Sequence, residues 1–518
     1  MEKDKTENHR GKYMNLLTME HVSKAYTDRV LLDDVGFGIN KNEKIGVIGV
    51  NGMGKSTLLK IVAGIEESDA GTISMGNQVK ICYLPQTPVF EAGTTILRAA
   101  TEGNYDELNR WTIEAEAKSM LNQLGFTDYD EKIEHMSGGQ KKRVALVRAL
   151  LTPADILVLD EPTNHLDNEM SEWLEEYLIQ FRGAILMVTH DRYFLDRVVT
   201  KIIELDMGHC TVFSGNYSAY SDKKAMLRDA AIRAYLNQQQ EIRHQEEVIT
   251  KLKSFNREKS IKRAESREKM LSKMDLLEKP TEINDAMHIT LEPCVTSGND
   301  VLSVRELAKS FDGMTLFTDL NFEVKRGERI AIIGNNGTGK TTILKMINGL
   351  LTPDNGEIRL GSKVHIGYYD QEHQVLHMDK TLFDELQDTY PDMNNTQIRN
   401  VLAAFLFTGD DVFKRIRDLS GGERGRVSLA KLMLSEANFL ILDEPTNHLD
   451  IASKEILENA LVHYTGTVLY VSHDRYFINK TATRILDLTM GTLINYIGNY
   501  DYYLEKKETQ EKAYLASA

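Results

Sequence analysis

The stretches GVNGMGKST at residues 49–57 and GNNGTGKTT at residues 334–342 decide the fold of this chain. Each matches the pattern G-x-x-x-x-G-K-[ST], follows a short apolar run (IGVIG at 45–49, IAIIG at 330–334) and precedes an apolar helical pattern. A buried strand, a glycine loop and a helix in that order place backbone N–H groups and a helix N-terminus around phosphate. The sequence therefore predicts two binding sites for nucleotide phosphates.

The side chains of these two loops have separate expected roles. Lys55 and Lys340 are placed to reach the β- and γ-phosphates, and Ser56 and Thr341 to ligate Mg²⁺. Further contacts with the nucleotide are expected from the other glycines, asparagines and threonines of the loops, namely Gly49, Asn51, Gly52, Gly54, Thr57, Gly334, Asn336, Gly337, Gly339 and Thr342.

The chain is an internal duplication. Lys55 and Lys340 are 285 positions apart, while the segments GNYSAY (215–220) and GNYDYY (498–503) are 283 apart. Each copy is about 200 residues long, which is a normal length for one domain. We expect a disordered lead at 1–13, a first domain at 14–215, an interdomain linker at 216–299, a second domain at 300–503 and a short C-terminal helix or tail at 504–518.

An acidic motif follows in each copy, as ILVLDEPTNHLD at 156–167 and FLILDEPTNHLD at 439–450. Apolar residues that end in two acids describe a buried strand with carboxylates at its C-terminal tip, the edge at which α/β sheets bind ligands. Asp160 and Asp443 are therefore expected to hold Mg²⁺. Glu161 and Glu444 are expected to orient and polarise the attacking water.

A serine and two glycines open a basic helical stretch in both copies, as MSGGQ (136–140) and LSGGE (419–423). Such a helix start leaves N–H groups free for an anion, although a single occurrence could be only a helix cap. The spacing to the acidic pair is 23 residues in both copies, which favours a nucleotide contact. The expected contacts are Ser137, Gly138, Gly139, Gln140, Ser420, Gly421, Gly422 and Glu423. The difference between Gln140 and Glu423 leaves open whether the two sites turn over at equal rates.

Composition limits the binding partners and the cellular compartment that the protein can be expected to have. The formal net charge of −15 argues against general attraction to nucleic acid, so any such contact must be local. Three cysteines at no disulfide or zinc spacing indicate a reducing cytoplasm. No apolar stretch is long enough to cross a membrane, and the first residues lack the apolar core of a signal peptide.

Residues 216–280 are rich in charged and glutamine residues and predict helix. Apolar residues recur along two seams that suit two antiparallel helices with a turn near 254–260, namely Tyr235, Ile242, Ile249 and Leu252, and then Ile261, Ala264, Leu271 and Met274. Residues 251–279 contain ten Lys or Arg and five Asp or Glu, so this tip is locally basic.

The order of phosphate loop, glutamine, serine–glycine signature, acidic pair and histidine resembles the ATP-binding cassette superfamily. Two cassettes in one chain, a charged linker, no membrane domain and DEPTNHLD in both halves resemble its ABC-F subfamily over about residues 14–505. The resemblance implies an α/β fold with two P-loop ABC-type nucleotide-binding domains joined by a long α-helical hairpin linker. It also implies hydrolysis of ATP with Mg²⁺ as cofactor.

Some roles are implied by the resemblance alone. Tyr26 and Phe311 hold the aromatic position that stacks on adenine, although each could also be a core aromatic residue. Gln86 and Gln371 match the glutamine that senses Mg²⁺ and the γ-phosphate.

The resemblance also implies how the halves cooperate. His190 (VTHDRYF) and His473 (VSHDRYF) match the switch histidine at the γ-phosphate, and Asp167 and Asp450 belong to the loop that crosses between cassettes. ATP would lie between the halves, with the 49–57 loop and the 419–423 signature forming site one. The 334–342 loop and the 136–140 signature would form site two. Because a triphosphate contacts both halves, its binding would favour closure.

Members of the subfamily reach with the linker toward tRNA and the peptidyl-transferase region of the ribosome. The residues expected to contact RNA are Lys253, Phe255, Arg257, Lys259, Lys262, Arg263 and Arg267, because basic side chains bind phosphates and an aromatic ring stacks on a base. The alternatives are a charged coiled coil that acts only as a spacer, a motor for a separate membrane exporter, and a DNA-handling cassette ATPase.

The layout is compact. Gln86 to Ser137 spans 51 positions and Gln371 to Ser420 spans 49, so no sizeable extra arm is expected in the first cassette. No C-terminal coiled coil is expected either. This layout resembles members that protect the ribosome against antibiotics, and translation factors share it. We expect a cytoplasmic monomer in which the two cassettes form an intramolecular dimer.

Overall fold

The computed structural model describes residues 14–517 except 27–28, 105–109, 165, 255–256, 276, 278–294, 312–313, 370–375, 406, 408, 436, 448 and 490. The predictions made for the lead at 1–13, for Phe255 and for Gln371 lie outside the described residues. Met1–Tyr217 and Ile289–Ala518 form one compact unit that contains both cassettes, and Ser218–His288 form a second unit.

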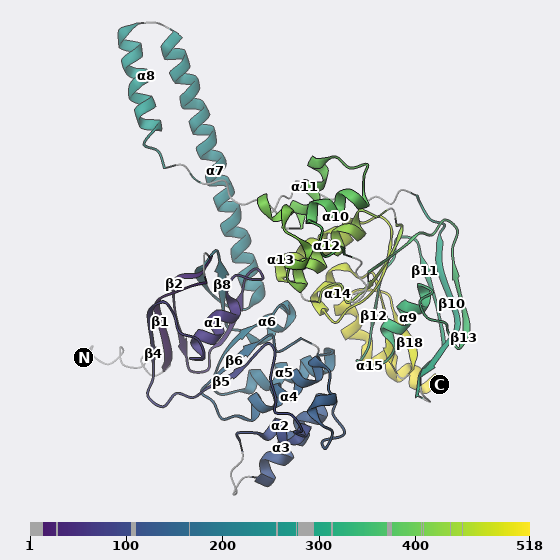
Figure 1. The fold of residues 1–518 in the computed structure, drawn as a ribbon. Coiled ribbons are helices and arrows are strands. Elements are labelled where there is room, and N and C mark those ends of the chain that lie inside the picture. Colours follow the sequence, from purple (N-terminus) through teal and green to yellow (C-terminus); the bar gives the residue numbers. More distant parts are fainter. Residues whose placement is uncertain are drawn as a thin grey trace, which may run out of the picture. The chain divides into compact units, whose positions relative to one another are not determined.

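The first cassette is built on a six-stranded sheet in the order β5-β6-β7-β3-β8-β9. It is the part of the chain coloured from purple to blue in Figure 1. All neighbours are parallel except β8 and β9. The strands are β3 (Lys44–Ile48), β5 (Ile81–Leu84), β6 (Ile156–Asp160), β7 (Ala184–Val188), β8 (Lys201–Asp206) and β9 (His209–Ser214). Every residue of β3, β6 and β7 is buried, because central parallel strands are covered on both faces and read as continuous apolar runs.

Helices and a small sheet complete this cassette. The helices are α1 (Lys55–Val62), α2 (Ile96–Thr101), α3 (Arg110–Gln123), α4 (Gly138–Leu151), α5 (Asn168–Gln180) and α6 (Arg192–Val198). An antiparallel three-stranded sheet contains β2 (Arg29–Asn40), β1 (Asn15–Tyr26) and β4 (Ala70–Met75), in that order. Leu17, Val22, Ile39 and Leu58 pack in the core between this sheet and β3.

The second cassette repeats the same topology, which confirms the duplication. Its large sheet has the order β14-β15-β16-β12-β17-β18, and its small sheet β11-β10-β13. The strands are β10 (Asp300–Phe311), β11 (Met314–Lys325), β12 (Arg329–Ile333), β13 (Asn355–Leu360), β14 (Ile366–Tyr369), β15 (Phe439–Asp443), β16 (Thr467–Val471), β17 (Arg484–Thr489) and β18 (Thr492–Tyr496). The helices are α9 (Lys340–Ile347), α10 (Leu382–Thr389), α11 (Asn395–Ala404), α12 (Gly421–Met433), α13 (Ile451–His463), α14 (Arg475–Thr481) and α15 (Tyr500–Ser517).

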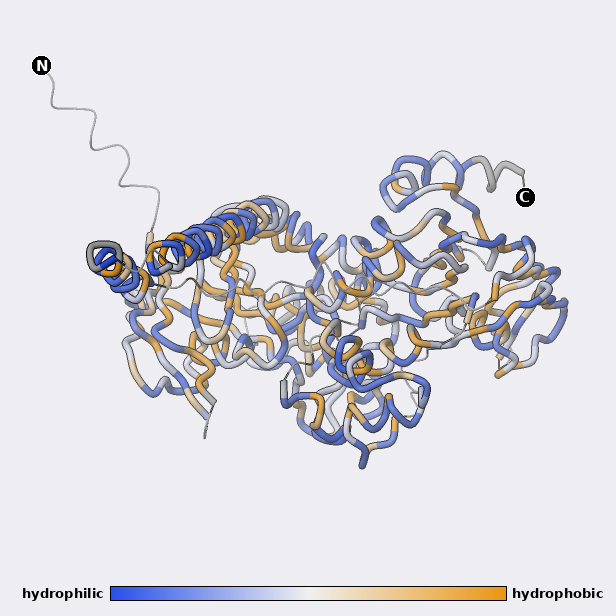
Figure 2. Tube along the Cα trace, turned by 90° about the horizontal axis from the view of Figure 1, so that it is seen from above, coloured by the Kyte–Doolittle hydropathy of each residue, from blue (hydrophilic) through white to orange (hydrophobic). Residues whose placement is uncertain are grey.

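The linker contains α7 (Tyr217–Ser254) and α8 (Glu258–Leu271), and the predicted turn near 254–260 includes the end of the first helix and the start of the second. Ile249 and Ala264 of the two predicted seams are buried. In Figure 2 the long helix alternates between apolar and polar colours along its length, as an amphipathic pattern requires. The seam also holds a polar pair, because Arg267 donates a hydrogen bond to the side chain of Gln245, which is itself buried.

The prediction of helix as far as residue 280 is wrong for the described residues that follow Leu271. Gln238 of α7 donates from Nε2 to the carbonyl of Asp275 (2.8 Å), and its Oε1 accepts from the backbone N–H of Leu277 (2.8 Å). One side-chain amide thus satisfies two backbone groups that a longer helix would have paired internally.

Candidate active site

The catalytic motifs meet because they follow adjacent parallel strands. In the first cassette the glycine loop follows β3, the acidic pair stands at the tip of β6, and His190 follows β7, which lies between those two strands. Ligands bind at this edge of α/β sheets, where neighbouring crossovers leave the sheet in different directions. The second cassette places its loop, Asp443, Glu444 and His473 in the same way after β12, β15 and β16.

A cavity of about 1870 Å³ joins the two sets of motifs within the unit formed by the cassettes. Most of the predicted residues line it: Asn51, Gly52, Gly54, Lys55, Ser56, Thr57, Gln86, Ser137, Gly139, Gln140, Glu161 and His190, and also Phe311, Asn336, Gly337, Gly339, Lys340, Thr341, Thr342, Ser420, Gly421, Gly422, Glu423, Glu444 and His473. Asp160 lines it as well, whereas Tyr26, Gly49, Gly138, Gly334 and Asp443 do not. Both phosphate loops and both signatures therefore face one space.

The loop lysines are buried against their own loops. Lys55 Nζ donates to the carbonyl of Gly49 (2.7 Å), the carbonyl of Val50 (3.1 Å) and Asn51 Oδ1 (3.2 Å). Lys340 Nζ donates to the carbonyls of Gly334 (2.7 Å) and Asn335 (2.8 Å). Burial lowers the pKa of both ammonium groups, and the nearby glutamates oppose that shift. Each cation is thus held where phosphate oxygens would enter.

The carboxylates at the strand tips suit Mg²⁺. No hydrogen bond of normal geometry reaches either carboxylate oxygen of the buried Asp160, although Ser56 faces it and opposes the rise in its pKa that burial causes. In the second cassette Thr341 Oγ1 donates to Asp443 Oδ1 (3.2 Å). A hydroxyl beside a carboxylate offers the hard oxygen ligands that this ion prefers. Bound there, Mg²⁺ would neutralise charge on the phosphate oxygens.

Of the two glutamates predicted to be catalytic, Glu161 is buried and Glu444 is half-buried, and both adopt an unusual backbone conformation. Glu161 has φ 53° and Glu444 has φ 47°, in the left-handed region that non-glycine residues rarely occupy. Such strain persists where the surrounding structure enforces it, often at functional sites. Burial raises the pKa of Glu161 and of Glu444 to about 7. A carboxylate in this range accepts a proton readily near neutral pH, as a base that polarises water must.

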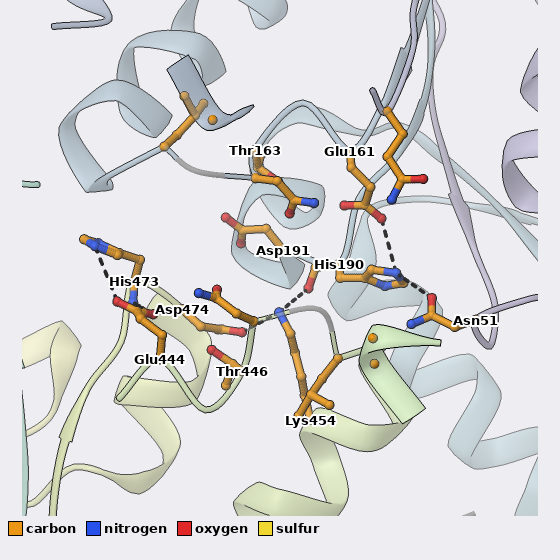
Figure 3. Close-up of a pocket in the computed structure, with 18 of the residues that line it drawn as sticks. Asn51, Glu161, Thr163, His190, Asp191, Glu444, Thr446, Lys454, His473 and Asp474 are labelled. Carbon is orange, nitrogen blue, oxygen red and sulfur yellow. Dashed lines mark hydrogen bonds and ion pairs between the residues drawn. The ribbon is translucent and has the colours of Figure 1, made fainter. Parts of the chain in front are cut away.

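A histidine predicted to be the switch residue faces each glutamate (Figure 3). His190 Nε2 lies 3.2 Å from Glu161 Oε1 and 3.2 Å from Asn51 Oδ1, so it connects the acidic pair with the phosphate loop. His473 Nε2 lies 3.5 Å from Glu444 Oε1, and the backbone N–H of His473 donates to Glu444 Oε2 (3.2 Å). Burial lowers the pKa of His190 well below 6.5 and that of His473 to about 3, so both imidazoles are neutral.

The aspartates expected to cross between the cassettes do so. Asp450 Oδ2 of the second cassette accepts from the backbone N–H of Asn51 in the first (3.0 Å). Asp167 Oδ2 accepts from the backbone N–H of Asn336 (3.4 Å) in the reciprocal contact. Each phosphate loop is therefore tied to the opposite cassette, which agrees with the predicted composition of site one and site two.

The signature residues Gln140 and Glu423 have the same local role despite their difference in charge. Ser137 and Ser420 cap α4 and α12, and in each capping box the third helical residue accepts a hydrogen bond from the serine N–H. The distances are 2.9 Å to Gln140 Oε1 and 2.8 Å to Glu423 Oε2. The Ser420 hydroxyl also donates to Glu423 Oε2 (2.7 Å).

Tyr26 and Phe311 occupy equivalent places at the ends of β1 and β10, and each ring has a lysine ammonium over it. Both are about half exposed, at 46% and 44%. Phe311 lines the cavity, whereas the Tyr26 hydroxyl is hydrogen-bonded to Glu66 outside it. Stacking on adenine stays a prediction for both rings.

Two buried ion pairs across the interface were not predicted from the sequence. Arg192 binds Glu458 through both terminal nitrogens, and Arg475 binds Glu175, so each arginine reaches into the opposite cassette. All four side chains are at most 1% exposed. Arg192 and Arg475 are the arginines of the repeated HDRYF segment, and this identity in both copies was the available signal.

Aromatic rings surround these pairs. The guanidinium of Arg192 lies 3.9 Å from the centre of the Tyr476 ring, and that of Arg475 lies 4.2 Å from the Tyr193 ring. The tyrosine after glycine and asparagine in GNYSAY, Tyr217, packs edge-on against Tyr476, and its counterpart Tyr500 packs against Tyr193. These ion pairs and ring contacts are thus reciprocal, since each is made once in either direction.

A duplicated α/β core with two phosphate loops, two signatures and two acidic pairs around one cavity defines an ATP-binding cassette ATPase. A family model described as ABC transporter matches residues 32–164 and 317–447, and a second model with the same description matches residues 203–289. No helix in the described part of the chain is long and apolar enough to cross a membrane.

Related proteins narrow the class. YdiF of Bacillus subtilis is 42% identical over 96% of this chain and 84% of its own length. ABC transporter F family member 2 of Arabidopsis thaliana is 37% identical over 94% and 78%, and the energy-dependent translational throttle protein EttA of Mycobacterium tuberculosis is 35% identical over 95% of both chains. The solved structure of RNase-L Inhibitor shares the fold, with a TM-score of 0.63 at 22% identity over 90% of this chain and 87% of that one. The chain belongs to the ABC-F subfamily and is an ATPase.

The reciprocal ion pairs give a prediction about stability. We expect Arg192→Met to lower the free energy of unfolding by about 3 kcal/mol, because it leaves the buried Glu458 without its main partner. The double variant Arg192→Met/Glu458→Leu should recover most of this loss, since two apolar side chains can replace a buried pair. Urea denaturation measures both, with the exposed Lys506→Met as control. A double variant as unstable as the single one would contradict the argument.

The raised pKa values give a prediction about pH. A folded-state pKa of about 7 against an ordinary 4.5 means that the folded protein binds protons more tightly in this interval. Its stability therefore falls as pH rises toward 7. Between about pH 6 and pH 8, each glutamate should cost about 1 kcal/mol in the absence of nucleotide and metal. Glu161→Gln and Glu444→Gln should remove this slope, whereas Glu508→Gln, at an exposed position, should not. Equal slopes in all variants would refute it.

Proposed function

We propose that this ATPase acts on the ribosome in translation, in the cytoplasm. The observation that carries the proposal is the 35% identity with EttA over 95% of both chains, since that protein is named for throttling translation. In this proposal ATP and Mg²⁺ close the cassettes, the closed protein binds the ribosome as a monomer, and hydrolysis releases it. Closure requires that ATP bind the closed state more tightly than the open one.

The chain's own residues divide the work. Lys55 and Lys340 bind phosphate, and Asp160 with Ser56 and Asp443 with Thr341 hold Mg²⁺. Glu161 and Glu444 take a proton from the attacking water, while the neutral His190 and His473 each contact the glutamate of their own site. His190 also contacts Asn51 of its phosphate loop. The backbone N–H groups of Asn51 and Asn336 bind aspartates of the opposite cassette. Closure of the two cassettes therefore forms a contact directly with each phosphate loop.

The linker hairpin is proposed to contact tRNA and rRNA near the peptidyl-transferase region. Its tip is locally basic in an acidic chain, and phosphate contacts need only such a local patch. Lys253 is bound to Glu268 (2.6 Å) and Arg267 to Gln245. The exposed Arg257 and Arg263 are therefore better placed to bind phosphate than those two. Protection of the ribosome against an antibiotic is one outcome that such a contact could have.

Trapping the closed state tests the function. Glu161→Gln/Glu444→Gln should bind ATP without hydrolysing it, because an amide cannot accept the proton of the attacking water. This variant should co-sediment with ribosomes in the presence of ATP and stay in the supernatant in the presence of ADP. The unchanged chain should co-sediment only transiently. A trapped variant that binds duplex DNA in place of ribosomes, or binds neither, would overturn the proposal.

Charge reversal tests the role of the hairpin. In the trapped background, Arg257→Glu/Arg263→Glu should weaken ribosome binding and make it less sensitive to salt. The logarithmic slope should fall by roughly 1 for each phosphate that the hairpin no longer binds. The variant Lys41→Glu/Lys80→Glu changes the net charge equally, at exposed positions of the first cassette, and serves as control. Equal effects of both variants would show that net charge, rather than the hairpin, governs binding.

A further inference from the structure

The two sites are not exact copies, and one difference between them is a buried cation. Lys454 lies in the first turn of α13, four residues after Asp450. The equivalent position of the first cassette, four residues after Asp167, is Ser171. Both side chains are buried, at 7% and 6% exposure, and both line the cavity.

Lys454 connects the switch loops of the two cassettes (Figure 3). Its Nζ donates to the backbone carbonyl of His190 in the first cassette (2.9 Å) and to Asp474 Oδ2 in its own (2.7 Å). His190 is the switch histidine of site one, and Asp474 directly follows the switch histidine of site two. Asp474 is itself fixed, because it caps α14 by accepting from the backbone N–H of Phe477 (2.9 Å).

Site two has no equivalent of this bridge through Ser171. The same contact there would join residue 171 to the carbonyl of His473 and to Asp191, the counterpart of Asp474. A serine hydroxyl stands one bond from Cβ, whereas a lysine ammonium stands at the end of a four-carbon stem, so serine lacks the reach. The aspartate contacts differ in the same direction, since Asp450 holds Asn51 at 3.0 Å and Asp167 holds Asn336 at 3.4 Å.

We propose that Lys454 is a positioning residue that makes the two ATP sites unequal. It holds the switch loop of site one against the second cassette, so that His190 and Glu161 stay aligned with the first phosphate loop when ATP is bound. Site one therefore hydrolyses bound ATP faster than site two. The inference rests on the ATPase activity and is independent of any action on the ribosome.

Single-site backgrounds isolate the effect. Glu444→Gln leaves hydrolysis to site one, and Glu161→Gln leaves it to site two. In the first background Lys454→Ser should lower the single-turnover rate at saturating ATP roughly tenfold, the usual effect of a lost hydrogen bond to a charged group. In the second background the same change should alter the rate less than about twofold. Lys454→Arg should restore most of the rate, because a guanidinium can also donate to both acceptors.

The affinity for ADP separates positioning from damage. Lys55 and its loop, which bind ADP, do not contact Lys454 by any hydrogen bond in the described structure, so ADP should bind Lys454→Ser unchanged. An equal loss of rate in both backgrounds, or a parallel loss of ADP affinity, would show a merely structural role and overturn the proposal.

The reciprocal change provides a gain-of-function test that removes no buried charge. Ser171→Lys in the Glu161→Gln background should raise the rate of site two. The exchange Lys454→Ser/Ser171→Lys should reverse the order of the two sites. If Lys454→Ser does not fold, as thermal unfolding would show, Ser171→Lys decides alone. An unchanged rate at site two in a folded Ser171→Lys protein would refute the proposal.

Discussion

Two buried guanidinium–carboxylate pairs, Arg192 with Glu458 and Arg475 with Glu175, set the register of the cassettes on which both sites depend. Charges are costly to bury, and here each is matched by an opposite charge and covered by a tyrosine ring. Both arginines belong to the segment that carries the switch histidine. A shift of one cassette would therefore leave buried charges unpaired at the same moment as it moved His190 or His473.

Burial, which makes the charged pairs costly in free energy, also changes the pKa values of the predicted catalytic groups. Glu161 and Glu444 stand at the tips of fully buried strands, in a left-handed backbone conformation that directs them toward the cavity. Removal from water raises their pKa to about 7, while it keeps the facing histidines neutral. A neutral histidine does not compensate the glutamate's charge, so the carboxylate keeps its affinity for a proton. Burial by the fold thus raises the pKa of the two glutamates, and the lysines of the phosphate loops oppose that rise.

Sequence reasoning named residues that lie together in the structure where an expected chemical role demands residue types at a short, fixed spacing. The phosphate loops, the acidic pairs and the signatures are of this kind, and their common edge of the sheet follows from strand order. It failed where the partner lies hundreds of residues away: nothing near Glu458 marks it as the partner of Arg192. It failed also at Gln238, whose side chain ends α8 early by satisfying the backbone near Asp275. Tertiary contacts of this sort override a helical composition that is otherwise uniform.

In a duplicated chain each position of one copy can be compared with the equivalent position of the other. A residue that differs between the copies makes one ATP site different from the other. Two departures place a cation near Glu161: Lys454 stands where the other copy has Ser171, and Lys142 stands where it has Gly425. Both lysines are buried, and both oppose the rise in the pKa of Glu161 that burial causes. For Glu444, Lys454 acts in the same sense but no counterpart of Lys142 exists, since Gly425 has no side chain. Because the reciprocal ion pairs are kept in both halves, the cassettes can still close as one unit. The two extra lysines therefore change the surroundings of the catalytic groups and leave the contacts that close the cassettes unchanged. This is expected if one nucleotide is hydrolysed before the other within a single closed state.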